Sequence, residues 1–258
     1  MTCPWASRTL IAHELKKLED VVSVSVVEPV LTDQGWRFGI YPGSGRDDVN
    51  GATYLHELYT RADPGICGRA TVPVLWDKKR KTIVNNESAE IVRMFNSGFA
   101  GLADNRVDLY PQALRTAIDA LNERLYPALN NGVYRAGFAT TQTAYDEAYD
   151  DVFVMLNVLE SYLADRPFLL GVPFSEADIR LFVTLVRFDI AYHGLFKCNL
   201  RRISEHPNLT AYLKRVLDLP GIRDTVNIDH IKKGYYSVKS LNPNGIVPKG
   251  PDLSDLGL

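Results

Sequence analysis

Apolar positions near the start of the chain first follow a helical spacing and then a strand-like one. Ile11, Leu15 and Leu18 recur as on one face of a helix, which predicts a helix over residues 5–19. Valines alternating with serines follow directly, and this β-branched alternation predicts a strand over residues 21–27. The chain therefore opens with a helix followed by a strand.

The rest of the first hundred residues shows the patterns of a long loop, two short helices and a hairpin. A polar, glycine-rich stretch over residues 31–52 predicts a long loop, and a short helix is expected over 54–62. Two apolar runs, 71–77 and 82–84, flank a charged turn and predict a hairpin. A further helix is expected over 86–95. With one strand placed in front, this order is the thioredoxin-like β-α-β-α-β-β-α.

The remainder of the chain carries only helical patterns. They lie near residues 111–130, 141–164, 176–194, 206–218 and 222–236. Ser175 and Asp178 have the spacing of a helix-capping box, and the Pro- and Gly-containing tail from Asn242 predicts irregular structure. We expect an α/β thioredoxin-like domain over residues 1–104, without its first strand, and an all-α domain with an irregular extension over 105–258.

Composition and charge exclude several classes of protein. Hydrophobic residues make up 46% and charged residues 23%, which permits a proper core. The net charge of −2 does not favour nucleic-acid or anionic-membrane partners, and no apolar run has the length of a membrane span. Cys3, Cys67 and Cys198 are too few for a disulfide framework and, with the five histidines, lack metal-ligand spacing. We expect a cytoplasmic protein that needs no metal and no flavin.

Cys3 carries the strongest chemical signal. It precedes Pro4 at the expected start of the first helix, where unpaired N–H groups and the helix dipole favour an anion and lower a thiol pKa. Ala6 stands where a Cys-x-x-Cys motif would have its second cysteine. An oxidised Cys3 would therefore need an external thiol such as glutathione, although most lone cysteines are only small buried hydrophobes.

A thioredoxin-like half followed by a helical half resembles the glutathione transferases. A closer resemblance, to the glutathionyl-hydroquinone reductases of the Xi class, which are omega-like, spans nearly the whole chain. It rests on Cys3 to Thr9, Val72 to Asp77, Asn86 to Ser88, Ile179 to Phe182, Arg187 to Asp189, Tyr192 to Gly194, Phe196 to Asn199 and Asn242 to Pro248. The resemblance implies glutathione as co-substrate and a homodimer.

The resemblance also implies which residues hold glutathione. A cis proline at Pro73 would expose the backbone of Val72 to the cysteinyl part of glutathione, although a proline here could merely begin an edge strand. Glu87 and Ser88 would hold the γ-glutamyl group, although the pair could be a simple helix cap. Trp36 would cover glutathione, although a tryptophan in such a loop could instead fill the core, and Arg69 would lie near the charged groups of glutathione.

Tyrosines are the second set that the resemblance singles out. It implies that Tyr134, Tyr192 and Tyr235 hydrogen-bond the phenolic oxygens of the substrate beside Cys3. Aromatic residues on helices are more often core residues, and spacing leaves open whether Tyr235 or Tyr236 points inward.

The expected activity is glutathione-dependent reduction of glutathionyl-hydroquinones through a mixed disulfide between Cys3 and glutathione. The alternatives are an omega-type thioltransferase or dehydroascorbate reductase, and an inactive glutathione-binding fragment. Members of this family carry a segment before the cysteine that includes the first strand. We therefore expect this chain to be an N-terminally truncated form that is poorly soluble or inactive, because two strand edges would be left unpaired.

Overall fold

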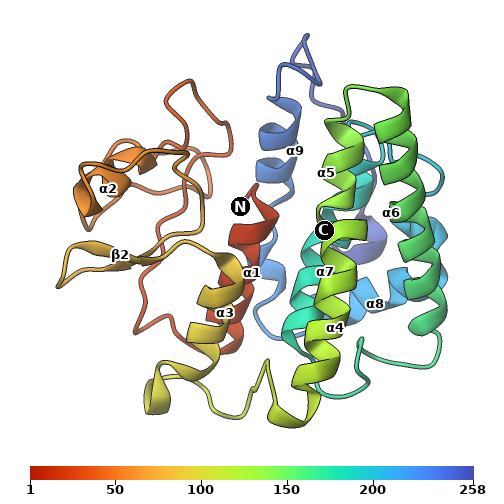
Figure 1. Ribbon diagram of the computed structural model, residues 1–258, viewed down its shortest axis with the longest axis horizontal. Helices are drawn as coiled ribbons and strands as arrows, with labels where there is room; N and C mark the ends of the chain where they lie inside the picture. Colours follow the sequence, from red (N-terminus) through yellow and green to blue (C-terminus); the bar gives the residue numbers. More distant parts are fainter. The chain divides into compact units, whose positions relative to one another are not determined.

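The computed structural model describes residues 1–258, which form two compact units (Figure 1). Unit 1 comprises Met1–Asn105 and Asp224–Ser237, and unit 2 comprises Arg106–Arg223 and Val238–Leu258. Unit 1 is therefore built from two separate parts of the sequence. This differs from the contiguous division expected from the sequence, because residues 224–237 pack within unit 1.

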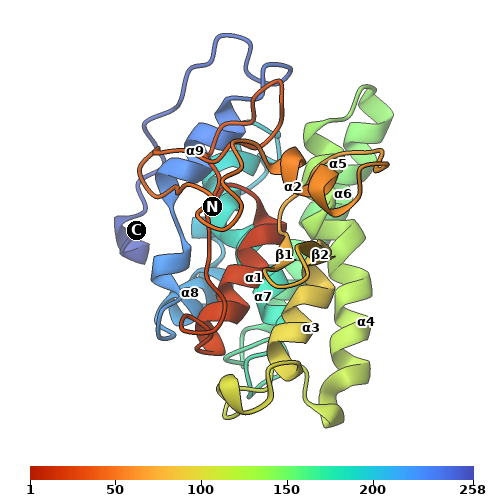
Figure 2. The same cartoon turned by 90° about the vertical axis from the view of Figure 1, so that its left-hand side faces the viewer.

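Unit 1 contains a small hairpin and four helices of eight or more residues. These elements are α1 (Pro4–Leu15), α2 (Leu55–Ala62), β1 (Leu75–Asp77), β2 (Thr82–Asn85), α3 (Ser88–Ser97) and α9 (Ile228–Tyr236). Helix α1 packs beside α3, and α2 packs beside β2 (Figures 1 and 2). The predicted helices of the first hundred residues are confirmed, with α1 ending four residues earlier than expected.

The hairpin forms where the apolar runs and the charged turn predict it. Trp76 pairs with Ile83 and Asp77 with Thr82 in an antiparallel ladder. The Asp77 carboxylate accepts hydrogen bonds from the N–H groups of Lys79 and Arg80 at 2.9 and 2.8 Å. This local bonding closes the turn, which is a common role of aspartate at such positions.

The prediction of a strand over residues 21–27 is wrong. This segment runs irregularly, and the backbone of Ser23, Val24 and Ser25 makes no hydrogen bond. The alternation of valine and serine is typical of a strand, but a strand exists only where a neighbouring strand supplies hydrogen-bond partners. The sheet of unit 1 contains only β1 and β2, and neither pairs with this segment.

Unit 2 is helical, as the sequence predicts. Its main helices are α4 (Arg115–Leu125), α5 (Gly132–Gly137), α6 (Gln142–Tyr162), α7 (Glu176–Arg187) and α8 (Pro207–Leu217). Turns of π-helix extend α4 over Tyr126–Asn130 and α7 over Phe188–Tyr192. Within this bundle α5 packs against α6, and α4 and α8 pack against α7 (Figure 1). No helix of the structure is both long and apolar enough to cross a membrane.

Helix α7 is the centre of unit 2, and its N-terminus is fixed by a buried cap. All residues of α7 except Arg180 are buried. The Asp178 carboxylate accepts hydrogen bonds from the N–H groups of Ser175 and Leu169, both at 2.9 Å, and from the Tyr212 hydroxyl at 3.2 Å. The capping box predicted from Ser175 and Asp178 is confirmed. It satisfies donors that would otherwise be buried without partners.

Candidate functional site

Cys3 lies at the N-terminus of α1, at the position that precedes the first helical residue. Its backbone is extended, with φ −70° and ψ 122°, and Pro4 begins the helix. The side chain is half-buried, and its Sγ lies 3.9 Å from the carbonyl oxygen of Val72. The fold therefore brings together Cys3 and the Val72–Pro73 segment, which are far apart in the sequence.

The Val72–Pro73 peptide bond is cis. The N–H group of Val72 makes no hydrogen bond within the protein, so it is available to an extended ligand. The preceding residue, Thr71, is held by Tyr59 of α2, whose hydroxyl donates to the Thr71 carbonyl oxygen at 2.8 Å. The same hydroxyl accepts from Asn86 Nδ2 at 3.1 Å. Neither Tyr59 nor Asn86 is singled out by the sequence as a site side chain.

Glu87 and Ser88 open α3, as the sequence predicts. Glu87 is the capping residue, and its carboxylate accepts hydrogen bonds from the Ala89 N–H group and the Ser88 hydroxyl, both at 3.3 Å. The Glu87 side chain is exposed, whereas Ser88 is only 1% exposed. Capping and ligand binding are compatible here, because a carboxylate accepts more than two hydrogen bonds.

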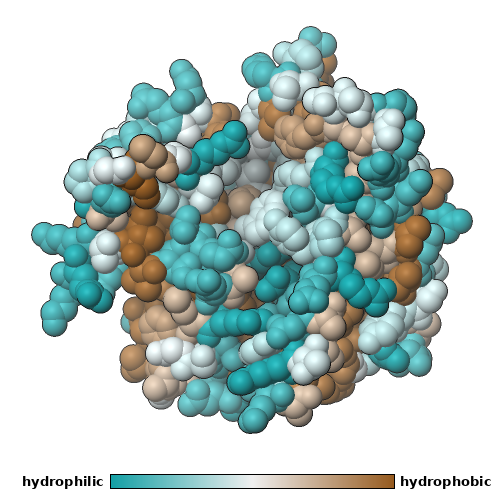
Figure 3. Space-filling view, in the orientation of Figure 1, coloured by the Kyte–Doolittle hydropathy of each residue, from teal (hydrophilic) through white to brown (hydrophobic).

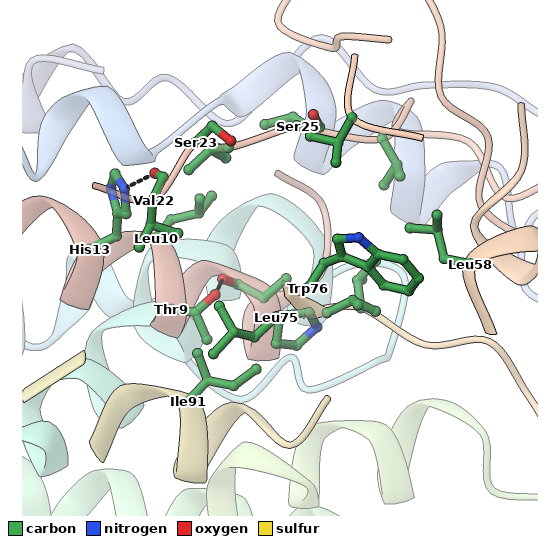
Figure 4. Close-up of a pocket in the computed structure, with 18 of the residues that line it drawn as sticks. Thr9, Leu10, His13, Val22, Ser23, Ser25, Leu58, Leu75, Trp76 and Ile91 are labelled. Atoms are coloured by element: carbon green, nitrogen blue, oxygen red, sulfur yellow. Dashed lines mark hydrogen bonds between the residues drawn. The ribbon is translucent and has the colours of Figure 1, made fainter. Parts of the chain in front are cut away.

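A cavity of about 640 Å³ lies within unit 1, and Cys3, Trp36, Val72 and Pro73 are among its lining residues. Figure 4 shows Val22, Ser23 and Ser25 on one side of it, opposite Leu75 and Trp76 of β1. The Trp76 Nε1 atom is shielded from solvent and has no hydrogen-bond partner. The cavity therefore separates β1 from the segment that was predicted to be a strand.

Trp36 and Arg69 occupy different environments in unit 1. Trp36 is half-buried and packs against the hydrophobic cluster formed by Phe38, Leu55 and Tyr59, while it also lines the cavity. Arg69 is exposed in the loop that leads to Val72. Trp36 thus packs against the hydrophobic core of unit 1 and also lies beside the cavity.

The candidate tyrosines fall in both units. In unit 2, the ring centroids of Tyr134 and Tyr192 are 5.8 Å apart, and each lies 5.2 Å from that of Phe196. Tyr192 is fully buried and Tyr134 is half-buried. In unit 1, Tyr235 is 5% exposed on α9, and burial raises the pKa of its half-buried neighbour Tyr236.

The other two cysteines lie in environments unlike that of Cys3. Burial raises the pKa of the Cys198 thiol to about 12, so this thiol stays protonated near neutral pH. Cys67 is exposed in a loop, and all three cysteines are free thiols. The structure contains no group of three or more His, Cys, Asp or Glu side chains placed to hold a metal ion.

Comparisons with known families match both units. The pattern of the family "Glutathione S-transferase, N-terminal domain" matches residues 2–97, and that of "Glutathione S-transferase, C-terminal domain" matches residues 142–215. The chain is 52% identical to the glutathionyl-hydroquinone reductase YqjG of Escherichia coli, covering 97% of this chain and 77% of the relative. It is 51% identical to the glutathionyl-hydroquinone reductase PcpF of Sphingobium chlorophenolicum, covering 96% and 80%.

Solved structures agree with these relatives. The glutathione-bound structure of YqjG superposes with a TM-score of 0.95 at 52% identity, covering 97% of this chain and 82% of that chain. Glutathione transferase Xi 1 from Trametes versicolor superposes with a TM-score of 0.95 at 45% identity, covering 98% and 89%. The chain belongs to the Xi-class glutathione transferase family, together with the glutathionyl-hydroquinone reductases.

Proposed function

We propose that this protein is a glutathione-dependent enzyme that reduces glutathionyl-hydroquinones to hydroquinones. The Cys3 thiolate attacks the sulfur of the glutathionyl group, and the bond between sulfur and the aromatic carbon breaks. That carbon keeps the electron pair and takes up a proton, so the hydroquinone leaves and a Cys3–glutathione disulfide remains. The thiolate of a second glutathione attacks this disulfide, which releases oxidised glutathione and restores the Cys3 thiolate.

The observation that carries this proposal is the place of Cys3 at the start of α1, with its Sγ 3.9 Å from the Val72 carbonyl oxygen. The N-terminus of a helix stabilises a thiolate, and Ala6 stands where a Cys-x-x-Cys motif would supply a resolving thiol. A peptide-like ligand that pairs with the backbone of Val72 would lie beside the sulfur.

Glutathione binding is assigned to side chains and backbone groups of unit 1. The proposed set is Trp36, Arg69, Val72, Pro73, Glu87 and Ser88. The free N–H group of Val72 supports pairing with the cysteinyl part, as in strand addition. The N-terminus of α3 supports binding of the γ-glutamyl carboxylate, and the exposed Glu87 carboxylate supports binding of its ammonium group.

The aromatic part of the substrate is assigned to Tyr134, Tyr192 and Tyr235. Phenol hydroxyls are good donors to the oxygens of a departing hydroquinone. The cluster of Tyr134, Tyr192 and Phe196 in unit 2 supports an aromatic substrate, because aromatic rings favour edge and offset contacts with one another.

The test compares Cys3→Ala with Cys67→Ala. We expect Cys3→Ala to lose glutathione-dependent reduction of a glutathionyl-hydroquinone, whereas Cys67→Ala, which removes an exposed loop thiol, keeps it. Substrate added without free glutathione should raise the mass of the protein by one glutathionyl group on Cys3. Normal turnover by Cys3→Ala, or an internal disulfide to Cys67 or Cys198, would contradict the mechanism.

An omega-type thioltransferase is the second candidate. It is favoured by the 47% identity, over 96% of this chain and 82% of the relative, to the Schizosaccharomyces pombe protein named glutathione S-transferase omega-like 2. Parallel assays with a glutathionyl-hydroquinone and with dehydroascorbate separate the two activities. We also expect a homodimer in the reducing cytoplasm, which sedimentation and cell fractionation would test.

A further inference from the structure

The hydroxyl of Tyr59 joins three segments of unit 1 at one point. Its ring belongs to the hydrophobic cluster and is only 7% exposed. The hydroxyl donates to the Thr71 carbonyl oxygen at 2.8 Å, and it accepts from the Thr71 N–H group at 3.3 Å and from Asn86 Nδ2 at 3.1 Å. One donated and two accepted hydrogen bonds use the full capacity of a phenol.

The two residues bound by Tyr59 each stand directly before a segment assigned to glutathione. Thr71 precedes Val72, and Asn86 precedes Glu87, the capping residue of α3. A further hydrogen bond joins these neighbours, since Asn86 Nδ2 donates to Thr71 Oγ1 at 3.3 Å. Tyr59 therefore fixes the spacing between the Val72 backbone and the start of α3.

We propose that Tyr59 is a positioning residue that sets the distance between the two halves of the glutathione site. This inference rests on the proposed function, because it assigns the cysteinyl part of glutathione to Val72 and the γ-glutamyl part to Glu87 and Ser88. One tripeptide can engage both segments without distortion only when their spacing matches its own length. Tyr59 is not among the residues that line the cavity and acts through its hydrogen bonds to Thr71 and Asn86.

The test is Tyr59→Phe, which keeps the ring in the hydrophobic cluster and removes only the hydroxyl. We expect its dissociation constant for glutathione, measured by calorimetry, to be about five- to tenfold higher than that of the wild type. The KM for a glutathionyl-hydroquinone should rise similarly while kcat changes less than about twofold, because Tyr59 does not contact the reacting atoms.

A second variant keeps the test valid if Tyr59→Phe folds poorly. Asn86 is exposed, so Asn86→Ala should fold and weaken glutathione binding by a smaller factor. The double variant should bind no more weakly than Tyr59→Phe alone, because both changes break one network. Tyr162→Phe is the matched control, since Tyr162 is half-buried on α6 and its hydroxyl makes no hydrogen bond.

The outcomes separate this inference from the proposed function. A wild-type protein that fails to bind glutathione would overturn the proposed function, and the inference with it. Wild-type affinity for glutathione in Tyr59→Phe, or equal weakening in Tyr162→Phe, would overturn the role of Tyr59 alone. A lowered melting temperature with unchanged affinity would show that the hydroxyl serves only the stability of unit 1.

Discussion

At the scale of single residues, Asp178 is a buried cap of α7. Its carboxylate satisfies two backbone N–H groups and the Tyr212 hydroxyl in the interior of unit 2. We expect Asp178→Ala to lower the free energy of unfolding by about 3 kcal/mol, because it leaves buried donors without partners. Urea denaturation measures this, and a loss below about 0.5 kcal/mol would contradict it.

Asp178 should also make the stability of unit 2 depend on pH. Burial raises the pKa of Asp178 from 3.8 to about 6, although hydrogen bonds from Leu169, Ser175 and Tyr212 oppose this. The pKa of Asp178 is higher in the folded state than in the unfolded state, so the folded state binds the proton more tightly. The stabilisation that results is complete below the unfolded-state pKa of 3.8 and is lost as pH rises through the folded-state pKa of about 6. The free energy of unfolding of the wild type minus that of Asp178→Asn should therefore be larger at pH 4 than at pH 7. An equal value at the two pH values would contradict the raised pKa of Asp178.

Residues differ in how far their roles can be predicted from the sequence. Ser175 and Asp178 are readable because a capping box is local, with a fixed spacing of three residues. The position of Cys3 at the start of α1, with Ala6 three residues later, is readable for the same reason, whereas the chemical role of Cys3 stays a prediction. The role of Tyr59 is not, because its partners Thr71 and Asn86 lie 12 and 27 residues away and only the fold brings them together.

At the scale of elements, α9 depends on close packing at a glycine. A Cβ atom on Gly234 would lie 2.7 Å from the carbonyl oxygen of Pro29 and would overlap the side chain of Thr2. Alanine normally stabilises a helix relative to glycine, by about 1 kcal/mol. We nevertheless expect Gly234→Ala to destabilise the protein by about 1–3 kcal/mol, because the clash is with backbone that must shift.

Denaturant unfolding of Gly234→Ala and of Gly101→Ala tests this packing. A Cβ atom on Gly101 would meet nothing within 4 Å, so this control should stay within about 0.5 kcal/mol of the wild type. Equal stability of the two variants would show that α9 does not need the contact.

The helices with a strong periodicity of apolar residues could be predicted from the sequence. The irregular course of residues 21–27 and the short helix α5 could not. Residues 21–27 have the composition of a strand but lack a partner, which no local pattern can report. Helix α5 is absent from the expected elements because it has six residues and both ends are glycine, Gly132 and Gly137. Gly137 is required by packing, since a Cβ atom there would overlap the ring of Phe196.

At the scale of the whole molecule, unit 1 leaves apolar surface accessible around its cavity. Val24, Val49 and Val84 line the cavity and are 47%, 42% and 48% exposed. Figure 3 shows apolar surface on the side of unit 1 that carries the hairpin. With β1 paired only to β2, the other edge of β1 is open, and open edges favour aggregation.

We therefore expect the native protein to bind the dye ANS and to aggregate at high concentration. Both effects should weaken in Val24→Lys, which places a charge among the exposed apolar side chains that line the cavity. ANS fluorescence at background level, together with a soluble sample that scatters no light, would contradict this reading of the cavity.

The discontinuity of unit 1 has a consequence for synthesis on the ribosome. The Tyr41 hydroxyl bonds the Asp229 carboxylate at 2.5 Å, and the ring of His230 bonds the Pro42 carbonyl oxygen at 2.7 Å. Neither bond can form until residue 230 has left the exit tunnel, whereas most of unit 2 has already emerged by then. Unit 1 therefore starts first but waits for its last segment, and a nascent chain arrested before α9 would hold residues 106–223 of unit 2 behind a unit 1 that is still unfinished.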